Sequence, residues 1–479
     1  MSNNRTNTMI LAVFVVGAFF MILNETLLNI ALTELMHQFH VSRTTVQWMA
    51  SGFMMIMGII SPLSALIIQW FTTRKLFFTL IITFIIGSLI AGFALSFPML
   101  LIGRMVQAIG TGLMIPLIMN TMLLLFDEKK RGKIMGTIGL VIMFAPAIGP
   151  TLSGVIVDLL GWRWLFFIVI PFMLFTLIFA YKYLSNVGEV TKPRIDILSI
   201  VLSTIGVTGI IYGFSESSSA EGGFLNPLTA LPIIIGFLSI IVFVLRQRKL
   251  KEPILDFSVL KYANYRRGIL IFLIVMMSMF ASEIVMPMYL QGPMGFSAKV
   301  AGFILLPGAI LNGLLSPAMG ALFDKIGPRK LILPGLFALF GVALFYTKIH
   351  PGLSMITFII AYIVLMVAIS AIMMPASTNG LNALPKEKYP HGTAIFNLLQ
   401  PIGGALGVAI FVGILTALQN HKLQELGSKT KEAANEAMTF GLHGSFFFAA
   451  ILIAIAIVIA STLTTASNEK SKIKASRKG

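Results

Sequence analysis

Long apolar stretches recur through this chain from Met9 to Leu463, and no other feature limits its possible folds as strongly. Each stretch is long enough to cross about 30 Å of hydrocarbon as an α-helix, which takes about 20 residues. Within hydrocarbon, only helices and closed β-barrels satisfy all their backbone hydrogen bonds. The short alternating segments that a barrel needs are absent from the sequence. We therefore predict an all-α integral membrane protein.

Charged residues are too few for a water-soluble protein of this size. They make up 11% of the 479 residues, against 57% hydrophobic residues, whereas a soluble domain carries about 25% charged residues. The net charge of +17 would suit nucleic acid, but basic residues of membrane proteins gather in cytoplasmic loops, so we expect no nucleic-acid partner. Cysteine is absent, which excludes disulfides, zinc–thiolate sites and a thiol nucleophile.

Charged and turn-forming residues divide the apolar stretches into about fourteen predicted transmembrane spans. The first is too long for the apolar core of a cleavable signal peptide, and it carries polar residues. The third and fourth are separated only at Phe97–Pro98. The predicted spans are residues 9–32, 45–68, 76–97, 99–126, 134–157, 164–184, 197–214, 227–245, 269–290, 299–323, 331–347, 353–383, 391–418 and 440–464.

The distribution of basic residues predicts the orientation. With the N-terminus in the cytoplasm, Lys and Arg residues on the inner side outnumber those on the outer side roughly four to one. Both termini are therefore expected in the cytoplasm. On the outer side, Gln419–Thr439 has a helical composition and is predicted to form a short surface helix. The basic tail Asn468–Gly479 is predicted to be disordered and to lie against anionic lipid head groups.

Three ionisable residues fall deep inside predicted spans: Glu25, Glu283 and Arg104. A charge in hydrocarbon costs several kcal/mol unless it faces a cavity or a partner. Because burial disfavours the charged form of a carboxyl group, such a group can bind and release a proton near neutral pH. We predict that Glu25 and Glu283 handle protons or cations, and structural hydrogen bonding is the alternative. For Arg104 the alternative is structural pairing with carbonyl oxygens.

Two segments have unusual glycine and proline content. The fifth predicted span contains Pro146, Gly149, Pro150 and Gly154, which would break a soluble helix. In a membrane, neighbouring helices satisfy the freed backbone groups, and small residues allow close approach. A plain kinked packing helix is the alternative interpretation.

The second segment, residues 320–330, is predicted to be a cytoplasmic turn with charged residues. Its glycines permit a tight backbone, and its aspartate can pair with the basic residues or cap a helix. An ordinary charged loop is the alternative interpretation. The residues concerned are Gly320, Asp324, Gly327, Arg329 and Lys330.

Taken in order, these segments resemble the fourteen-span drug:proton antiporters of the major facilitator superfamily, and within them the lincomycin-resistance type of exporter, over about residues 10–465. Residues 320–330 resemble the superfamily's signature loop G-x-L-x-D-r-x-G-x-R-K, a conformational latch. Residues 101–116 resemble the fourth-span motif, whose arginine is tied to proton coupling. Residues 145–154 resemble the exporters' antiporter motif G-P-x-x-G-G, with Ser153 in place of one glycine.

Two places depart from the family pattern. In the first span the resemblance is to L-D-x-T-i-v-N-v-A-L-P, but Asn24 stands where aspartate is usual and the acid, Glu25, follows one position later. One position turns a side chain by about 100° around a helix, which changes the face that carries the acid. At the place in the first half that corresponds to the latch, Trp70 replaces the acidic residue, which puts a salt-bridge latch there in doubt.

The resemblance implies two six-helix bundles with a central cavity between them, which rock to expose the cavity alternately to each side. The implied division is residues 1–186, a two-span linker 187–268, residues 269–465, and the tail 466–479. The residues predicted to line the cavity are Asn24, Asn29, Gln107, Met286, Tyr289, Asn397 and Gln400.

The predicted function is proton-coupled export of small apolar or cationic drugs by a monomer in a bacterial cytoplasmic membrane. The partners are the drug, protons and the lipid bilayer. No cofactor, metal or catalytic residue is expected, and the sequence lacks a phosphate-binding loop for ATP. A lipid or glycolipid flippase and an exporter of one metabolite are the alternatives, while the Gly149–Pro150 motif argues against an importer.

Overall fold

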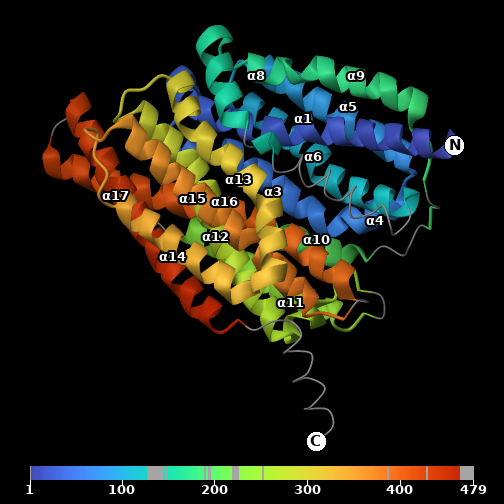
Figure 1. The fold of residues 1–479 in the computed structure, drawn as a ribbon. Coiled ribbons are helices and arrows are strands. Elements are labelled where there is room, and N and C mark those ends of the chain that lie inside the picture. The colour runs from blue at the N-terminus through green and yellow to red at the C-terminus, as the bar shows by residue number, and fades with distance from the viewer. Residues whose placement is uncertain are drawn as a thin grey trace, which may run out of the picture.

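The computed structural model describes residues 2–126, 144–146, 148–187, 190–191, 196–217, 226–250, 253–385, 388–427 and 430–463, which contain helices and no β-strand (Figure 1). The helices are α1 (Ser2–Phe39), α2 (Arg43–Val46), α3 (Trp48–Ile60), η1 (Ser61–Leu63), α4 (Ser64–Trp70), α5 (Thr73–Gly92), α6 (Phe97–Leu125), α8 (Trp164–Phe167), α9 (Val169–Tyr183), α10 (Ile197–Ser217), α11 (Pro227–Gln247), η3 (Phe257–Lys261), α12 (Ala263–Gln291), α13 (Ala298–Ile326), α14 (Pro328–Tyr346), α15 (Met355–Asn382), α16 (Tyr389–Leu426) and α17 (Lys431–Ser461).

Within the described residues, thirteen helices are long and apolar enough to cross a membrane. A shorter apolar helix, Phe144–Leu160, covers the later part of the fifth predicted span, whose residues 134–143 lie outside the described part of the chain. Large apolar side chains point outward from α9 and α11, where Ile178 is 68% and Leu228 77% exposed. Such a large exposed apolar surface is unfavourable in water but favourable in contact with lipid hydrocarbon. The predicted all-α multi-pass membrane architecture is confirmed.

Two boundary predictions are wrong. The third and fourth spans are separated at residues 93–96, because α5 ends at Gly92 and α6 begins at Phe97. Pro98 lies in the first turn of α6, where a missing N–H breaks no helical hydrogen bond. The predicted surface helix at Gln419–Thr439 does not exist as a separate element, since its residues extend α16 and α17. The break between them is Gly427, whose left-handed φ of 59° ends α16.

The helices fall into two groups in the ribbon view (Figure 1). In one group α1 packs on α6 and α9, and α5 and α3 pack on α6. In the other, α12 packs on α15, α16 and α17, while α13 and α14 pack on α15. We call these the N-terminal half and the C-terminal half. The predicted domain boundaries at residues 186 and 268 stay a prediction.

The hairpin of α10 and α11 packs against α3 of the N-terminal half and α16 of the C-terminal half. Its two helices approach closely, since a Cβ atom on Gly209 would lie 2.5 Å from the Pro232 carbonyl oxygen. Trp48 of α3 donates a 3.0 Å hydrogen bond to Glu216 near the end of α10. At the other end of the hairpin, Arg246 and Asp196 form an ion pair of 2.8 Å.

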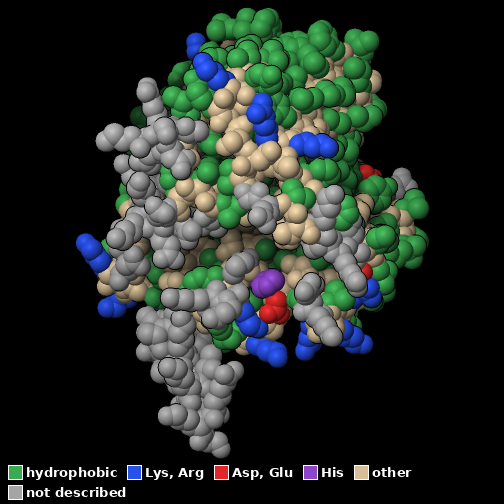
Figure 2. All heavy atoms as spheres, turned by 90° about the vertical axis from the view of Figure 1, so that its right-hand side faces the viewer, with side chains coloured by type: hydrophobic (Ala, Val, Ile, Leu, Met, Phe, Trp, Pro, Cys, Tyr) green, Lys and Arg blue, Asp and Glu red, His purple; other side chains and the backbone are tan. Residues whose placement is uncertain are grey.

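Successive long helices alternate in direction, so the connections lie on two faces of the molecule. We call the face where α1, α5, α12 and α14 begin the basic face, because Lys and Arg side chains are spread over it and acidic ones are few (Figure 2). The other is the opposite face. Basic residues at the helix ends on the basic face include Arg74, Lys75, Arg266, Arg267, Arg329 and Lys330.

Candidate functional site

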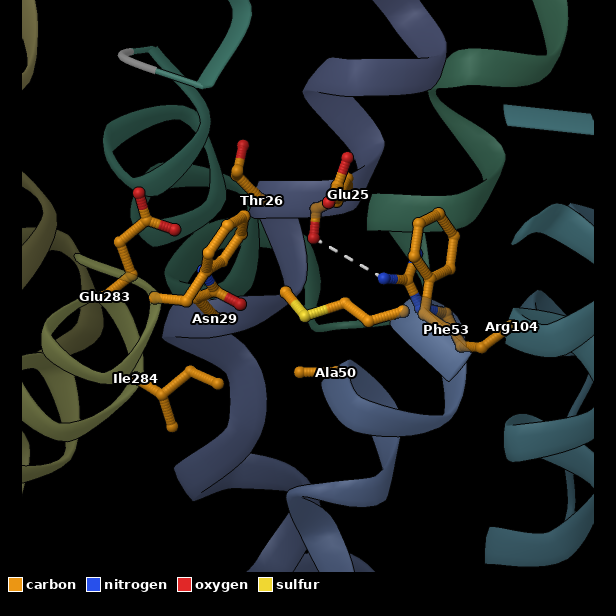
Figure 3. Close-up of a pocket in the computed structure, with 10 residues that line it drawn as sticks. Glu25, Thr26, Asn29, Ala50, Phe53, Arg104, Glu283 and Ile284 are labelled. Atoms are coloured by element: carbon orange, nitrogen blue, oxygen red, sulfur yellow. Dashed lines mark hydrogen bonds between the residues drawn. The ribbon is translucent and has the colours of Figure 1, made fainter. Parts of the chain in front are cut away.

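A small pocket lies where helices of the two halves meet near the middle of the spans (Figure 3). Its cavity of about 10 Å³ has room for about one water molecule, whereas drug-sized ligands need several hundred Å³. A ligand of that size would fit only if the halves moved apart. The lining residues are Glu25, Thr26 and Asn29 of α1, Ala50, Phe53 and Met54 of α3, Arg104 of α6, and Phe280, Glu283 and Ile284 of α12.

Arg104 is 1% exposed and is held by neutral oxygen atoms. Its Nη1 donates 3.1 Å hydrogen bonds to Asn24 Oδ1 and to Gln107 Oε1. Its Nη2 lies 3.4 Å from the backbone carbonyl oxygen of Glu25, and its Cζ lies 4.3 Å from the centre of the Phe53 ring. These contacts match the structural alternative, pairing with carbonyl oxygens. The guanidinium nevertheless lines the pocket, where its charge acts on Glu25.

The network continues from Arg104 into two further helices. Gln107 Nε2 donates a 2.7 Å hydrogen bond to Ser88 of α5, and Asn24 Nδ2 donates a 3.0 Å bond to the Leu165 carbonyl of α8. Buried polar groups in a membrane need such partners, because hydrocarbon offers none. The network therefore ties α1 to α5, α6 and α8.

The departure from the family pattern at Asn24 has a structural counterpart. Asn24 is 1% exposed and points to Arg104 and α8, whereas its neighbour Glu25 lines the pocket. A one-residue step on a helix turns the side chain by about 100°, which accounts for the two directions. Asn24, predicted to line the cavity, thus lies beside it as an acceptor for Arg104.

Glu283 approaches the same pocket from α12, in the C-terminal half (Figure 3). The two carboxyl groups are close enough to interact electrostatically. The Oε2 atom of Glu283 is buried and has no hydrogen-bond partner among the residues that the structure describes. The two acids found in the sequence therefore face one cavity, from opposite halves.

The other predicted cavity residues have varied positions. Asn29 lines the pocket, and Gln107 lies in the Arg104 network. Met286 and Tyr289 are 1% and 0% exposed inside the C-terminal half and do not line the pocket. No sequence signal marks the apolar wall, since Phe53 and Met54 cannot be told from lipid-facing residues by their type. Phe280 could have been found, because it precedes Glu283 by three positions and so shares its helix face.

Asn397 and Gln400 lie on the approach to the pocket from the basic face. Together with Thr393 and Gly404 they share one face of α16, by helical spacing. At Gly404 this face meets the pocket wall, since a Cβ atom there would lie 2.6 Å from the Met54 sulfur and 2.9 Å from the Phe280 ring. Thr393, Asn397 and Gln400 are exposed. Polar side chains inside a membrane span face a water-filled space rather than lipid.

The two halves contact each other between the pocket and the opposite face. Thr151 Oγ1 donates a 3.0 Å hydrogen bond to the Gly302 carbonyl, and Gln291 Nε2 donates a 3.1 Å bond to the Ile30 carbonyl. Arg43 reaches from α2 to Gln419 of α16 and to the Met438 sulfur of α17. The pocket is therefore covered on that side.

The residues of the predicted antiporter motif take part in this closure. A Cβ atom on Gly154 would lie 2.5 Å from the Ala298 carbonyl oxygen, and one on Gly302 would lie 2.8 Å from the Pro150 carbonyl oxygen. Gly149 packs on Thr26, a residue of the pocket. Pro146 lies partly buried near the start of the helix. The glycines thus allow backbones of the two halves to touch.

The predicted latch forms the sharp turn between α13 and α14. Gly327 joins the two helices with a positive φ of 81°, a conformation that favours glycine. Arg329 and Lys330 are exposed, and a Cβ atom added at Gly320 would lie 3.9 Å from the Met374 side chain. The side chain of Asp324 lies outside what the structure describes. The latch role stays a prediction.

The described residues contain no group of three or more His, Cys, Asp or Glu side chains placed to bind an ion. The pocket instead combines two carboxyl groups, one guanidinium and a wall of aromatic and aliphatic side chains. Such a site suits an apolar or cationic ligand and a proton.

The chain is similar to known proteins over most of its length. Residues 14–408 match the Major Facilitator Superfamily. The chain is 44% identical to the lincomycin resistance protein LmrB of Bacillus subtilis, with 91% of each chain covered. It is also 44% identical to the protein of that name from Listeria monocytogenes, covering 94% of this chain and 95% of the relative.

Among solved structures, the chain resembles a bacterial homolog of the human lysosomal transporter Spinster. The TM-score is 0.68, with 98% of each chain covered and 15% sequence identity. At that identity the likeness concerns the fold alone.

Proposed function

This chain belongs to the Major Facilitator Superfamily, and from that membership we propose that it exports apolar or cationic drugs in exchange for protons. The observation that carries the proposal is that Glu25 and Glu283, from opposite halves, line one apolar-walled pocket. The 44% identity to proteins named for lincomycin resistance supports a drug as the substrate.

The proposed orientation places the basic face in the cytoplasm of a bacterial cell, with both termini on that side. It rests on the preference of Lys and Arg for cytoplasmic loops. The chain acts as a monomer, without a cofactor. In the conformation described, the drug would enter from the cytoplasm along the polar face of α16 and meet the pocket at Gly404.

Competition for the two carboxyl groups is the proposed basis of exchange. Two carboxylates in one closed apolar pocket cannot both stay charged without a compensating cation. Either protons or a cationic drug supply the positive charge, and Arg104 supplies part of it permanently. Protons bound from the opposite face would release the drug there, and their loss to the cytoplasm would prepare the site for the next drug.

The energy available is sufficient for useful export. One elementary charge moving down a membrane potential of 100 mV yields about 2.3 kcal/mol. If one neutral drug leaves per proton, this sustains a concentration ratio of about fifty. A pH gradient adds to that ratio.

Dye efflux in energised inverted vesicles tests the proposal, with a protonophore added midway. We expect protonophore-sensitive transport by wild type and its loss in E25Q or E283Q. E425Q is the control, since Glu425 pairs with Lys422 on an exposed surface. Normal proton-driven export by both E25Q and E283Q would refute the role of these acids. If folded wild-type protein moves no dye, a lipid or a single metabolite becomes the better substrate.

A further inference from the structure

Buried polar groups lie in the C-terminal half beyond Glu283, and the proposed exchange at the pocket does not involve them. Its Oε2 atom and the hydroxyl oxygen of Tyr346 are both buried without a hydrogen-bond partner in the described part of the chain. Buried polar atoms of native proteins are nearly always paired with protein or water. Two such atoms inside one helix group therefore point to a place that water enters.

A third side chain, Tyr362, connects the two. Tyr362 lies on α15, is 3% exposed, and interacts electrostatically with both Glu283 and Tyr346. Its ring packs on Gly308 of α13, where an added Cβ would lie 2.6 Å from the ring. Gly308 thus leaves the room that the tyrosine ring occupies.

The registers of α12 and α15 place Tyr362 and Glu283 at similar depth. The rings of Tyr289 and Phe358 meet at 6.0 Å between α12 and α15. Since the two helices are antiparallel, Glu283 lies six residues and Tyr362 four residues from that contact toward the membrane centre. At a rise of about 1.5 Å per residue, these steps are about 9 and 6 Å. Both groups therefore lie at the level of the pocket.

Tyr346 extends this row toward the opposite face. It is the last residue of α14, and its ring lies 4.7 Å from that of Phe446 on α17. One turn away on α17 is His443, which is partly exposed and whose Nε2 lies 2.7 Å from the Ile349 carbonyl oxygen. His443, Tyr346, Tyr362 and Glu283 thus form a row from the opposite face to the pocket, within the C-terminal half.

We propose that this row, together with bound water, conducts protons from the opposite face to Glu283 by a path separate from that of the drug. The proposal rests on the proposed proton-coupled function. Each hydroxyl or water accepts one proton on one side and gives up one on the other. The net change is one proton taken from solution and one carboxylate protonated, so no further reactant is needed.

A path behind Glu283 solves a problem of access. When a drug fills the pocket, water can no longer reach the carboxyl groups through the pocket itself. A proton that arrives through the C-terminal half can still neutralise Glu283 and loosen the bound drug. In this conformation neither the Tyr346 hydroxyl nor Glu283 Oε2 bonds to a protein group that the structure describes, so bound water has to complete the row.

The test uses the full chain in proteoliposomes and compares two activities of each variant. The first is drug uptake driven by a pH gradient, and the second is exchange of labelled for unlabelled drug at equal pH, which needs no net proton movement. For Y362F we expect gradient-driven uptake to fall roughly tenfold or more, as when a proton-transfer group is lost, with exchange kept within about twofold of wild type.

Y346F is the second variant and is expected to show the same separation of the two activities. The control is Y265F, a buried tyrosine of the same half whose hydroxyl donates a 2.8 Å hydrogen bond to the Gly392 carbonyl. A structural role predicts that any loss affects both activities alike, as we expect for Y265F. Normal gradient-driven uptake by Y362F, or an equal loss of exchange, would overturn the proton path while the proposed function stands. Wild type that exchanges drug but ignores the gradient would overturn both proposals.

Discussion

The polar groups on the two sides of the pocket differ in how they are paired. In the N-terminal half, Arg104 bonds to Asn24 and Gln107, which bond in turn to Leu165 and Ser88. In the C-terminal half, Glu283 and Tyr346 keep buried oxygen atoms without partners in the part of the chain that the structure describes. On the first side the polar side chains bond to one another in a connected network, although Arg104 Nε has no partner, whereas on the second side Glu283 Oε2 and the Tyr346 hydroxyl bond to no other group that the structure describes.

This difference means that the two carboxyl groups are not equivalent. Glu25 sits on a helix that the Arg104 network fixes to three others, next to a permanent positive charge. Glu283 has no comparable anchor and offers a free oxygen to a proton, water or a drug. We infer that the N-terminal half holds the site in place, and that the C-terminal half changes its partners during transport.

The largest expected effect is loss of the anchor by R104A. The substitution removes the donor from Asn24 Oδ1 and Gln107 Oε1, and each buried acceptor left unpaired costs about 1–3 kcal/mol. We expect a destabilisation of about 2–5 kcal/mol, measured as the free energy of unfolding in detergent. R248A is the control, since Arg248 is exposed. If both variants have the same free energy of unfolding as wild type, the Arg104 network does not stabilise the N-terminal half, and the proposed difference between the halves is refuted.

How far the sequence predicts this site depends on the kind of residue. Glu25, Glu283 and Arg104 were found because a charge within an apolar span is a rare signal with a known cost. Phe53 and Ile284 gave none, because apolar side chains are equally expected toward lipid, core or cavity. Asn24 was placed in the cavity, yet it points to Arg104, since helical periodicity does not say which neighbour a face meets.

The fold was predicted more fully than the site. Span number and type follow from hydrophobic length, which is a property of each segment alone. The predicted cavity positions of Met286 and Tyr289 differ from the structure because α12 is buried on most of its sides, so no lipid-facing side indicates how the helix is rotated. The predicted ends of two spans are wrong because α16 and α17 continue as helix beyond their apolar stretches.

A second test concerns the contact through which the two halves meet. G154A adds a methyl group 2.5 Å from the Ala298 carbonyl oxygen, where the neighbour is backbone and cannot turn aside. Overpacking of this kind costs about 1–3 kcal/mol, and it acts only when the opposite face is closed. We expect the population to shift toward a conformation open at that face.

The chain has no cysteine, so pairs of introduced cysteines can carry spin labels that report the separation of α13 and the Phe144–Leu160 helix. G341A is the control, since nothing lies within 4 Å of a Cβ atom there. An unchanged distance distribution in G154A would mean that this contact does not hold the halves together.

Removing one hydroxyl from each half tests the difference in hydrogen bonding directly. S88A takes away the acceptor of Gln107 Nε2 and leaves a buried amide unpaired, so we expect a loss of about 1–2 kcal/mol. Y346F removes a hydroxyl that has no partner among the described residues, so its effect on stability should be near zero or slightly positive. Both are measured as thermal midpoints under one condition. Equal losses would show that the C-terminal hydroxyls are paired after all.

The smallest loss of stability is expected for a charged pair outside the pocket, Arg246 and Asp196. This pair tests whether the stability that we expect from the Arg104 network comes from its charge or from its burial. The hydrogen bond from Arg246, with the bond from Ser199, lowers the pKa of Asp196 to about 2. Both side chains are partly exposed, at 36% and 20%, so D196N should cost at most about 1 kcal/mol at pH 7.

Because the pKa of Asp196 is lower in the folded chain than its ordinary value of about 3.9, this contribution is complete above about pH 4–5 and is lost as the pH falls toward 2. At pH 3, about half of the stability difference between wild type and D196N should remain. The thermal midpoints of both proteins at pH 7 and pH 3 measure it. If D196N loses as much stability as R104A, any paired charge in this molecule stabilises it to the same extent, buried or not. If the loss is small and depends on pH, the larger effect of R104A is due to the burial of the N-terminal network.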